Sequence, residues 1–368
     1  MADSRHVLLC EKRFPFPPDH GHATRVVTLA HVLRTLGFQV TLLVCSGEPS
    51  MLPDGTRVRT IPALVWPLRD LVLWLELRKI NRERPVDFLQ VQNDVFVVLA
   101  VLAKLTGFRV FYDAQLVEQD YWTALAARSP REIASSKVLP LAERVLCRIS
   151  ERISILSQRD RSRLEELHRL PPGKVLVVPI SPRRPAQTTT ETSGPGVRPI
   201  VLFLGSYAHR PNADAITIIE KEIRPRVLRK APDTVFRIVG NGLPVDALRA
   251  RGLEAYANVD EVAPFIDAAT ICVAPVRVGS GVRIKLVEYM SRGKAVVAMT
   301  PALEGLPVRP GIDLLVADDL DRFADDVVAL LKDEALRHRI GMSGFERIRD
   351  LTGEEAAATA LSRFYPPS

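Results

Sequence analysis

The densest group of residues that could do chemistry is the segment 275–293, PVRVGSGVRIKLVEYMSRG. Its pattern predicts the end of a strand, a Gly-Ser-Gly loop at 279–281 and a helix after the loop. Glycine lets a backbone approach a ligand closely, and the N-terminus of a helix favours negative charge. Arg283 and Lys285 place two cations in the first turn, where they oppose the helix dipole. We therefore predict an anion-binding site at this loop.

Three residues of the segment share one helical face, because Gly281, Lys285 and Glu288 are four and three positions apart. A phosphate at the glycine end would leave the Glu288 carboxylate about a turn away, where it can accept hydrogen bonds from a ribose diol. The alternative is an exposed i, i+3 ion pair between Lys285 and Glu288. The positions between them are nearly all apolar, which favours a buried helix and the ligand site.

The loop at 11–23, EKRFPFPPDHGHA, is a second candidate because it joins a strand to a helix. It lacks the G-x-G-x-x-G fingerprint, and no acidic residue ends the next strand, so a dinucleotide site is not predicted. Gly21, His22 and Arg25 could offer backbone N–H groups and a cation to an anion. A solvated loop with a glycine turn is the alternative. His20 and His22 have no further ligands around them, so no metal is predicted.

The elements that must position these loops alternate between strands and helices. Residues 6–10 (HVLLC) form a short apolar run, and an amphipathic helix pattern follows at 24–36. The alternation stops in the Pro- and Thr-rich stretch 181–199 and restarts at 200–205 (IVLFLG). This order predicts parallel sheets covered on both faces by helices.

We therefore expect an α/β protein of two doubly wound, Rossmann-like domains with a ligand cleft between them. The expected boundaries are a first domain at 1–185, a linker at 186–198 and a second domain at 199–345. A C-terminal helix at 346–368 is expected to cross back to the first domain.

Composition excludes several classes of protein. Hydrophobic residues make up 47% of the 368 residues and charged residues 25%, which excludes a disordered chain. The four cysteines form no CxxC pair, so neither a zinc site nor a disulfide framework is predicted. The sequence opens without a signal-peptide pattern, and its longest uncharged apolar run, 95–103, is too short to cross a bilayer. We expect a cytoplasmic protein.

The net charge of +7 belongs to one half of the chain. Residues 1–190 hold 27 Lys and Arg against 19 Asp and Glu, whereas residues 191–368 hold 23 against 24. No groove-reading motif accompanies the excess, so nucleic acid is not a predicted partner. An anionic ligand or the inner face of the cell membrane remains open. The stretch 66–84 is apolar early and basic late, which suits a membrane surface; a packed helix with a solvated basic end is the alternative.

Residues 200–345 resemble the C-terminal half of the family-four retaining glycosyltransferases, which have the GT-B fold. The matching pieces are FLGSY from Phe203 with RPN from Arg210, FRIVGNG from Phe236, GSGVRIKLVEYMSRGKAVV from Gly279 and PALEGL from Pro301. The first half resembles the family more loosely, through the Gly21 loop and the unit LAHVLRTLGFQVTLL. The resemblance implies two Rossmann-like domains, the C-terminal one holding a nucleotide-sugar and the N-terminal one the acceptor.

The resemblance also implies roles for single residues. Glu288 resembles the second Glu of the family's E-x7-E pair, which holds the ribose, while Arg283 and Lys285 resemble the residues that face the donor diphosphate. Gly205 resembles the glycine that ends the first strand of the donor domain. The nucleotide-sugar-binding residues are then expected to be Gly205, Gly279, Ser280, Gly281, Arg283, Lys285, Leu286, Val287 and Glu288.

Two positions depart from the family pattern. Ser280 stands where the first Glu of the pair is expected, as in the GSG-x-R-x-K subgroup, which leaves the donor sugar open. Many relatives have a His after the Asp of a segment that resembles YDAQ at 112–115. Gln115 can hydrogen-bond a sugar but cannot act as a general base. The expected acceptor-binding residues are Gly21, His22, Arg25, Asp113 and Gln115.

The function implied is that of a retaining, metal-independent hexosyltransferase. It would move a sugar from a nucleotide-sugar, a UDP-sugar first, to a hydroxyl of a saccharide, lipid-linked or small-molecule acceptor. The acceptor would attack on the leaving-group face while a donor phosphate oxygen takes the proton, with Arg283, Lys285 and Gln115 as the catalytic residues. No cofactor is implied besides the donor. Two alternatives stay open: a sugar-nucleotide epimerase of the same architecture, and a nucleotide-sugar-binding protein without catalysis.

Overall fold

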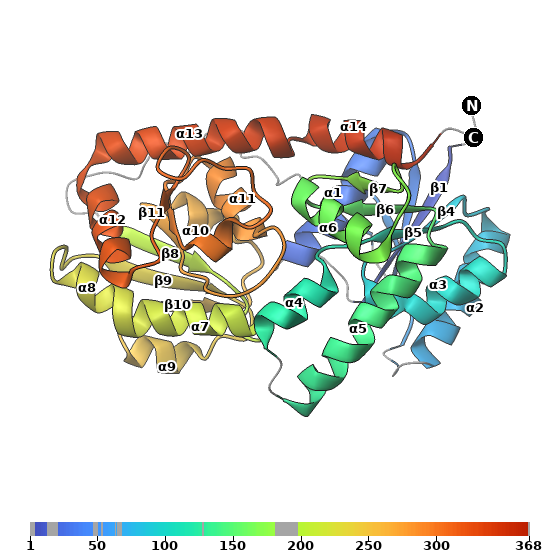
Figure 1. Ribbon diagram of the computed structural model, residues 1–368, viewed down its shortest axis with the longest axis horizontal. Coiled ribbons are helices and arrows are strands. Elements are labelled where there is room, and N and C mark those ends of the chain that lie inside the picture. Colours follow the sequence, from blue (N-terminus) through green and yellow to red (C-terminus); the bar gives the residue numbers. More distant parts are fainter. Residues whose placement is uncertain are drawn as a thin grey trace. The chain divides into compact units, whose positions relative to one another are not determined.

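The computed structural model describes residues 4–12, 21–46, 51–52, 54–62, 64, 68–126, 129–180 and 198–366. The chain forms two compact units, shown in Figure 1. The first unit holds the described residues that lie within 4–12, 22–180 and 354–366, and the second holds those within 198–353 together with Gly21. The predicted linker, 186–198, lies outside the described residues except for Arg198.

The first unit is built on a sheet of seven parallel strands in the order β3-β2-β1-β4-β5-β6-β7. The strands are β1 His6–Glu11, β2 Gln39–Val44, β3 Arg57–Thr60, β4 Phe88–Val91, β5 Val110–Asp113, β6 Arg152–Ile155 and β7 Val175–Val177. Helices connect them: α1 Gly21–Thr35, α2 Leu68–Glu83, η1 Asp94–Phe96, α3 Val97–Leu105, α4 Glu118–Leu125, α5 Pro130–Ile149 and α6 Gln158–His168.

Side chains of β1 alternate between the two faces of this sheet, as the period of two in a strand requires. Val7 and Leu9 pack in a core with α1 and the last helix of the chain, α14 Glu354–Phe364. Leu8 and Cys10 pack in a second core with α2, α3 and α5. Both faces are therefore covered, which explains why β1 is an unbroken apolar run in the sequence.

The end of the chain belongs to the first unit. The ring of Tyr365 stacks on that of Phe111 at 5.3 Å between centroids, and its hydroxyl is hydrogen-bonded to Gln90. The preceding helix, α13 Glu334–Thr352, is part of the second unit, so the chain passes from one unit to the other at Gly353. The predicted C-terminal helix at 346–368 is therefore two helices, and only α14 lies in the first unit.

The second unit holds six parallel strands in the order β10-β9-β8-β11-β12-β13. They are β8 Ile200–Leu204, β9 Val235–Gly240, β10 Glu254–Ala257, β11 Ile271–Ala274, β12 Val296–Ala298 and β13 Leu315–Val316. The helices are α7 Arg210–Ile218, η2 Ile219–Ile223, α8 Arg224–Leu228, α9 Val245–Ala250, α10 Ala263–Asp267, α11 Ile284–Ser291, η3 Thr300–Leu303, α12 Leu320–Lys332 and α13. The predicted fold class, two Rossmann-like α/β domains, is confirmed.

None of the helices in the described part of the chain combines the length and the apolar character needed to cross a membrane.

Candidate functional site

Glycines shape the carboxyl edge of the second sheet, where β8 and β9 end. The N–H of Gly205 donates to the carbonyl of Val239 at 2.9 Å. A Cβ on Gly205 would lie 2.8 Å from Cγ of Asn212, and a Cβ on Gly240 would lie 2.1 Å from the carbonyl oxygen of Gly205. The two backbones therefore approach each other because position 240 is glycine, while the glycine at 205 leaves room for the side chain of Asn212.

The Gly-Ser-Gly loop positions Arg283. Gly279 has a φ of +130°, and a Cβ there would lie 2.3 Å from Nη2 of Arg283. The guanidinium folds back over the loop, where Nη1 donates to the carbonyl of Ser280 at 3.3 Å. Helix α11 begins at Ile284 and Arg283 occupies its N-cap. The predicted cation therefore lies at the start of this helix.

The ammonium group of Lys285 is held from two sides. Nζ donates to Oδ1 of Asn212 at 2.8 Å and lies 4.1 Å from the centroid of the Phe203 ring. Asn212, near the start of α7, is itself fixed because its amide donates to the carbonyl of Ser206 at 3.1 Å. The hydrogen bond of Lys285 thus goes across to α7, whereas the alternative interpretation expected an ion pair with Glu288 along α11.

Lys285 and His209 are shielded from water and lie near positively charged groups, and both conditions disfavour protonation of the two side chains. Burial, and then the charge of Arg283, lower the pKa of Lys285 to about 7. Burial and the charges of Arg283 and Lys285 lower the pKa of His209, the residue before α7, to about 4. A negatively charged ligand at this place would offset the repulsion between the cations.

Other predicted donor residues divide into two groups. Ser280 is 7% exposed, and its hydroxyl oxygen has no hydrogen-bond partner among the described residues, as expected of a group that binds a ligand. Glu288 is half-buried one turn beyond Lys285. Leu286 and Val287 are fully buried in the core, and their N–H groups bond to the carbonyl of Arg283. The prediction that Leu286 and Val287 contact the nucleotide-sugar is therefore corrected: they hold α11 in place.

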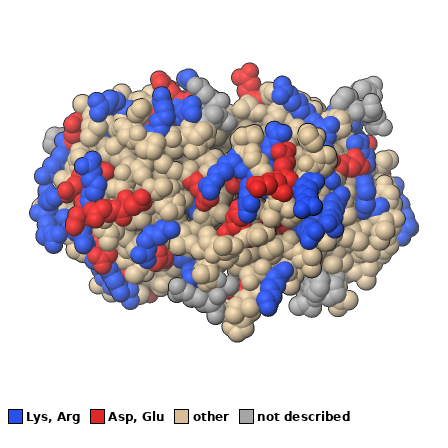
Figure 2. Space-filling model, in the orientation of Figure 1, with Lys and Arg blue, Asp and Glu red and all other residues tan. Residues whose placement is uncertain are grey.

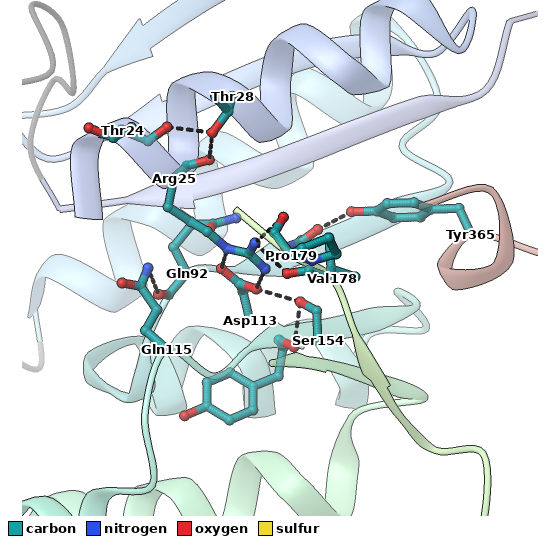
Figure 3. Close-up of polar contacts among 12 residues, drawn as sticks. Thr24, Arg25, Thr28, Gln92, Asp113, Gln115, Ser154, Val178, Pro179 and Tyr365 are labelled. Atoms are coloured by element: carbon teal, nitrogen blue, oxygen red, sulfur yellow. Dashed lines mark hydrogen bonds and ion pairs between the residues drawn. The ribbon is translucent and has the colours of Figure 1, made fainter. Parts of the chain in front are cut away.

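In the first unit, Arg25 and Asp113 form a buried ion pair, shown in Figure 3. Nε and Nη2 of Arg25 donate to the two carboxylate oxygens at 3.1 and 2.7 Å, and Nη1 donates to the carbonyl of Val178 at 2.7 Å. Ser154 donates a further hydrogen bond to Asp113. Arg25 is 1% exposed and Asp113 0%, so the prediction that these side chains contact the acceptor is corrected. They join α1 to β5 and to the segment after β7.

Near this pair, His22 and Gln115 present polar groups at the carboxyl edge of the first sheet. His22, next to the start of α1 at Gly21, is hydrogen-bonded to the carboxylate of Glu11 at the end of β1. Burial lowers the pKa of His22, but the hydrogen bond to Glu11 and its charge outweigh this and raise that pKa above its ordinary value. The amide of Gln115 donates to the carbonyl of Gln92 at 3.3 Å (Figure 3).

Sequence analysis missed a buried acidic cluster beyond these residues. Glu143 on α5 accepts from the N–H of Glu118 at 2.9 Å and from His168 at 2.8 Å. Burial, followed for Glu118 by the charges of Asp94 and Glu143, raises the pKa of Asp94 to about 7 and that of Glu118 to about 8. Gln92 is 0% exposed, and its side-chain amide has no partner among the described residues. The available signal was the polar run QND directly after the buried strand β4.

In the described part of the chain, no group of three or more His, Cys, Asp and Glu residues is arranged to hold a metal ion.

Comparisons with known proteins match both units to glycosyltransferases. Residues 198–333 match the family described as glycosyl transferases group 1, and residues 20–181 match the family described as glycosyl transferase 4-like domain. A phosphatidyl-myo-inositol mannosyltransferase of Mycobacterium tuberculosis is 31% identical over 163 residues, 40% of this chain and 42% of that protein. An uncharacterized 44.6 kDa protein in the cps region of Klebsiella pneumoniae is 24% identical over 161 residues, 41% of this chain and 42% of that protein. The matched segment therefore spans about two fifths of each of these relatives.

Solved structures share the fold over nearly the whole chain. A sucrose-phosphate synthase from Thermosynechococcus elongatus superimposes with a TM-score of 0.77 and 14% identity, covering 98% of both chains. Anabaena HepE in complex with UDP and glucose gives a TM-score of 0.71 and 11% identity, covering 97% of this chain and 98% of that one. These likenesses establish the fold as GT-B, a pair of Rossmann-like domains.

Proposed function

We propose, from the match of both units to glycosyltransferase families, that this chain transfers a hexose from a nucleotide-sugar to an acceptor hydroxyl. The transfer would retain the anomeric configuration and need no bound metal. One observation supports the donor assignment: Arg283, Lys285 and the neutral His209 converge at a glycine-lined edge, where burial and the neighbouring positive charges lower the pKa of Lys285 and that of His209. A diphosphate would supply negative charge at this edge. Anabaena HepE, with its UDP complex, supports UDP-sugars as the first donors to test.

Each donor residue would hold a different part of the nucleotide-sugar. Arg283 and Lys285 would bind the diphosphate, because their N–H donors are anchored at its expected place by Ser280 and Asn212. Glu288, one helical turn further along α11, would accept hydrogen bonds from the ribose hydroxyls. The unpartnered hydroxyl of Ser280 would bond to the donor sugar or a phosphate oxygen.

The chemical step would need charge stabilisation more than a protein base. The bond between the anomeric carbon and the diphosphate breaks while the acceptor oxygen bonds to the same face of that carbon, and the acceptor proton passes to a phosphate oxygen of the leaving group. Negative charge grows on the diphosphate during this step, so Arg283 and Lys285 would lower the barrier. Gln115 would orient a substrate hydroxyl without exchanging a proton itself.

A donor screen followed by product analysis tests this function. Thermal shifts with UDP-, GDP-, ADP- and dTDP-sugars identify the donor, and NMR of the product sugar after turnover reports the anomeric configuration. Transfer or hydrolysis with retention supports the proposal. Inversion at C2 of the sugar would indicate the epimerase, and tight binding without turnover would indicate a binding protein.

The first unit, which would bind the acceptor, carries exposed apolar and basic side chains on α2 and α5. We call the outward-facing surfaces of these two helices the α2–α5 face. Both helices pack on the same core of the first unit and both contact α3, and each carries exposed apolar side chains. We propose that this α2–α5 face contacts an anionic membrane, which would bring a lipid-linked acceptor to the enzyme. The exposed apolar residues are Leu68, Leu71 and Leu75 on α2 and Ile133, Val138 and Leu141 on α5, and the same helices carry exposed cations at Arg78, Lys79, Arg82, Lys137, Arg144 and Arg148.

Charge and hydrophobicity act together on such a face. Inserted leucine and isoleucine side chains lose contact with water, and the cations beside them are attracted to anionic headgroups. Figure 2 shows Lys and Arg side chains on the surfaces of both units, with Asp and Glu side chains among them. The net charge of +8 in residues 1–190 agrees with this proposal.

A further inference from the structure

A pocket of about 480 Å³ lies in the second unit, at the edge of the sheet where β9 and β10 begin. Its walls come from the starts of these two strands and from α8 and α9, which Figure 1 labels. The predicted donor residues lie at the opposite edge, after the carboxyl ends of β8 and β11. The pocket is therefore separate from the candidate donor site. We call it the three-arginine pocket, after Arg198, Arg224 and Arg249 in its lining.

No carboxylate of the described residues pairs with any of these three guanidinium groups. Backbone carbonyls hold them instead: Nε of Arg198 donates to Asp233 at 3.1 Å, Nη1 of Arg224 to Arg251 at 3.3 Å and Nη2 of Arg249 to Ala255 at 3.0 Å. A single carbonyl uses one of the five N–H donors that a guanidinium carries. Each arginine is thus anchored while most of its donors remain available.

Arginines just outside the pocket behave differently. Arg226 pairs with Asp321 at 2.7 Å, and Arg251 pairs with Glu220 at 3.1 Å. The carboxylate of Glu254, which is part of the lining, forms an ion pair with Nη2 of Arg237 at 2.7 Å. The lining therefore holds three arginines against one carboxylate, and that carboxylate already pairs with an arginine outside the pocket.

The shape of the pocket depends on a glycine and an aromatic ring. Gly252 has a φ of +81°, and a Cβ there would lie 2.4 Å from Nη2 of Arg224. The glycine leaves the room that the Arg224 guanidinium occupies. The ring of Tyr256 forms a wall, with the guanidinium carbon of Arg249 at 5.8 Å from its centroid. Gly252 and Tyr256 thus fix the places of the Arg224 and Arg249 guanidinium groups.

We propose that the three-arginine pocket binds a small ligand carrying a phosphate monoester or pyrophosphate group. Guanidinium groups bind phosphate oxygens through paired N–H donors, and three of them match a dianion or a more highly charged group. A volume of about 480 Å³ lies within the usual range for small-molecule sites, roughly 300–1,000 Å³. Because carbonyl groups already orient the arginines, binding costs less side-chain entropy than it would at free surface arginines. The proposal does not depend on the transferase activity.

Titration calorimetry with inorganic pyrophosphate and with glucose 1-phosphate tests this site in the full chain, in a buffer free of phosphate and sulfate. In the double variant Arg224→Gln/Arg249→Gln, we expect the Kd to rise at least about tenfold, since two charge-assisted contacts are lost. The matched control is Arg251→Gln, which removes a neighbouring charge that already has a carboxylate partner and should change the Kd by less than about twofold.

Further variants separate this site from the donor site and from unfolding. Lys285→Gln should retain the pyrophosphate binding that the double variant loses. Arg198→Gln, which disturbs neither α8 nor α9, should raise the Kd at least about threefold even if the double variant is unfolded by circular dichroism. Absence of binding to the wild-type chain, an unchanged Kd in Arg198→Gln, or loss of all binding in Lys285→Gln would overturn the proposal.

Discussion

The titration of Lys285 makes the donor site testable by pH alone. Burial, and next the charge of Arg283, lower the pKa of Lys285 to about 7 in the unliganded chain. A bound diphosphate favours the charged ammonium and raises that pKa. Binding therefore takes up a proton when the pH is above about 7, so the affinity for a nucleotide-sugar should fall as the pH rises through this value.

The size of the effect follows from the pKa. At pH 6 about nine tenths of the Lys285 side chains carry a proton, and at pH 8 about one tenth do. If only the protonated form binds the diphosphate well, the Kd rises up to about tenfold between pH 6 and pH 8, or about 1.4 kcal/mol. His209 adds nothing in this window, because its pKa of about 4 keeps the ring neutral throughout.

Titration calorimetry with UDP-glucose at pH 6, 7 and 8 measures this dependence, and buffers of different ionisation enthalpy report the proton uptake. Lys285→Arg is the matched control, because a guanidinium stays charged over the whole range and the slope should disappear. Any change of the Kd with pH that arises from the titration of His22 would persist in the Lys285→Arg variant. A wild-type Kd that is constant from pH 6 to pH 8, or an equal slope in Lys285→Arg, would refute the reasoning.

Four other changes have defined outcomes. Glu288→Ala should raise the Kd for the nucleotide-sugar at least about tenfold with an unchanged circular dichroism spectrum, and an unaltered Kd would remove the ribose assignment. A chelator should leave the transfer rate unchanged; inhibition that a divalent ion reverses would contradict metal-independent transfer. Arg25→Met leaves the carboxylate of Asp113 buried without its cation, so urea unfolding should show a loss of about 3–5 kcal/mol, and a loss below about 1 kcal/mol would show that the pair contributes little. Leu71→Glu/Leu141→Glu should abolish cosedimentation with phosphatidylglycerol vesicles at low salt; equal cosedimentation of this variant and the wild type would exclude the α2–α5 face.

The strands that sequence analysis missed share one kind of place in the sheets. Residues 6–10 and 200–205 were found because central parallel strands are buried on both faces and therefore form continuous apolar runs. The strands β3, β10 and β13 were missed, and all three lie at the edge of a sheet. Their sequences, RVRT, EAYA and LV, are short or partly polar because an edge strand is only partly buried.

The site residues show the same division. The Gly-Ser-Gly loop and its cations follow each other in the chain, so spacing alone predicted that they act together. Arg25 and Asp113 are 88 positions apart, and each by itself has the character of a ligand-binding residue. Their mutual burial, which gives them a structural role instead, depends on the packing of α1 against β5.

The sequence by itself therefore determined the two α/β units, the glycine-rich loop that carries Arg283 and Lys285 at the start of a helix, and the basic character of the first half. These features are local patterns of hydrophobicity, glycine and charge. The tertiary structure alone decided which partner a polar group has, such as Asn212 for Lys285 and backbone carbonyls for the arginines of the three-arginine pocket. It also decided that the hydroxyl of Ser280 has no partner among the described residues. Hydrogen bonds and pKa values depend on distance and burial, and both are set by residues that are far apart in the chain.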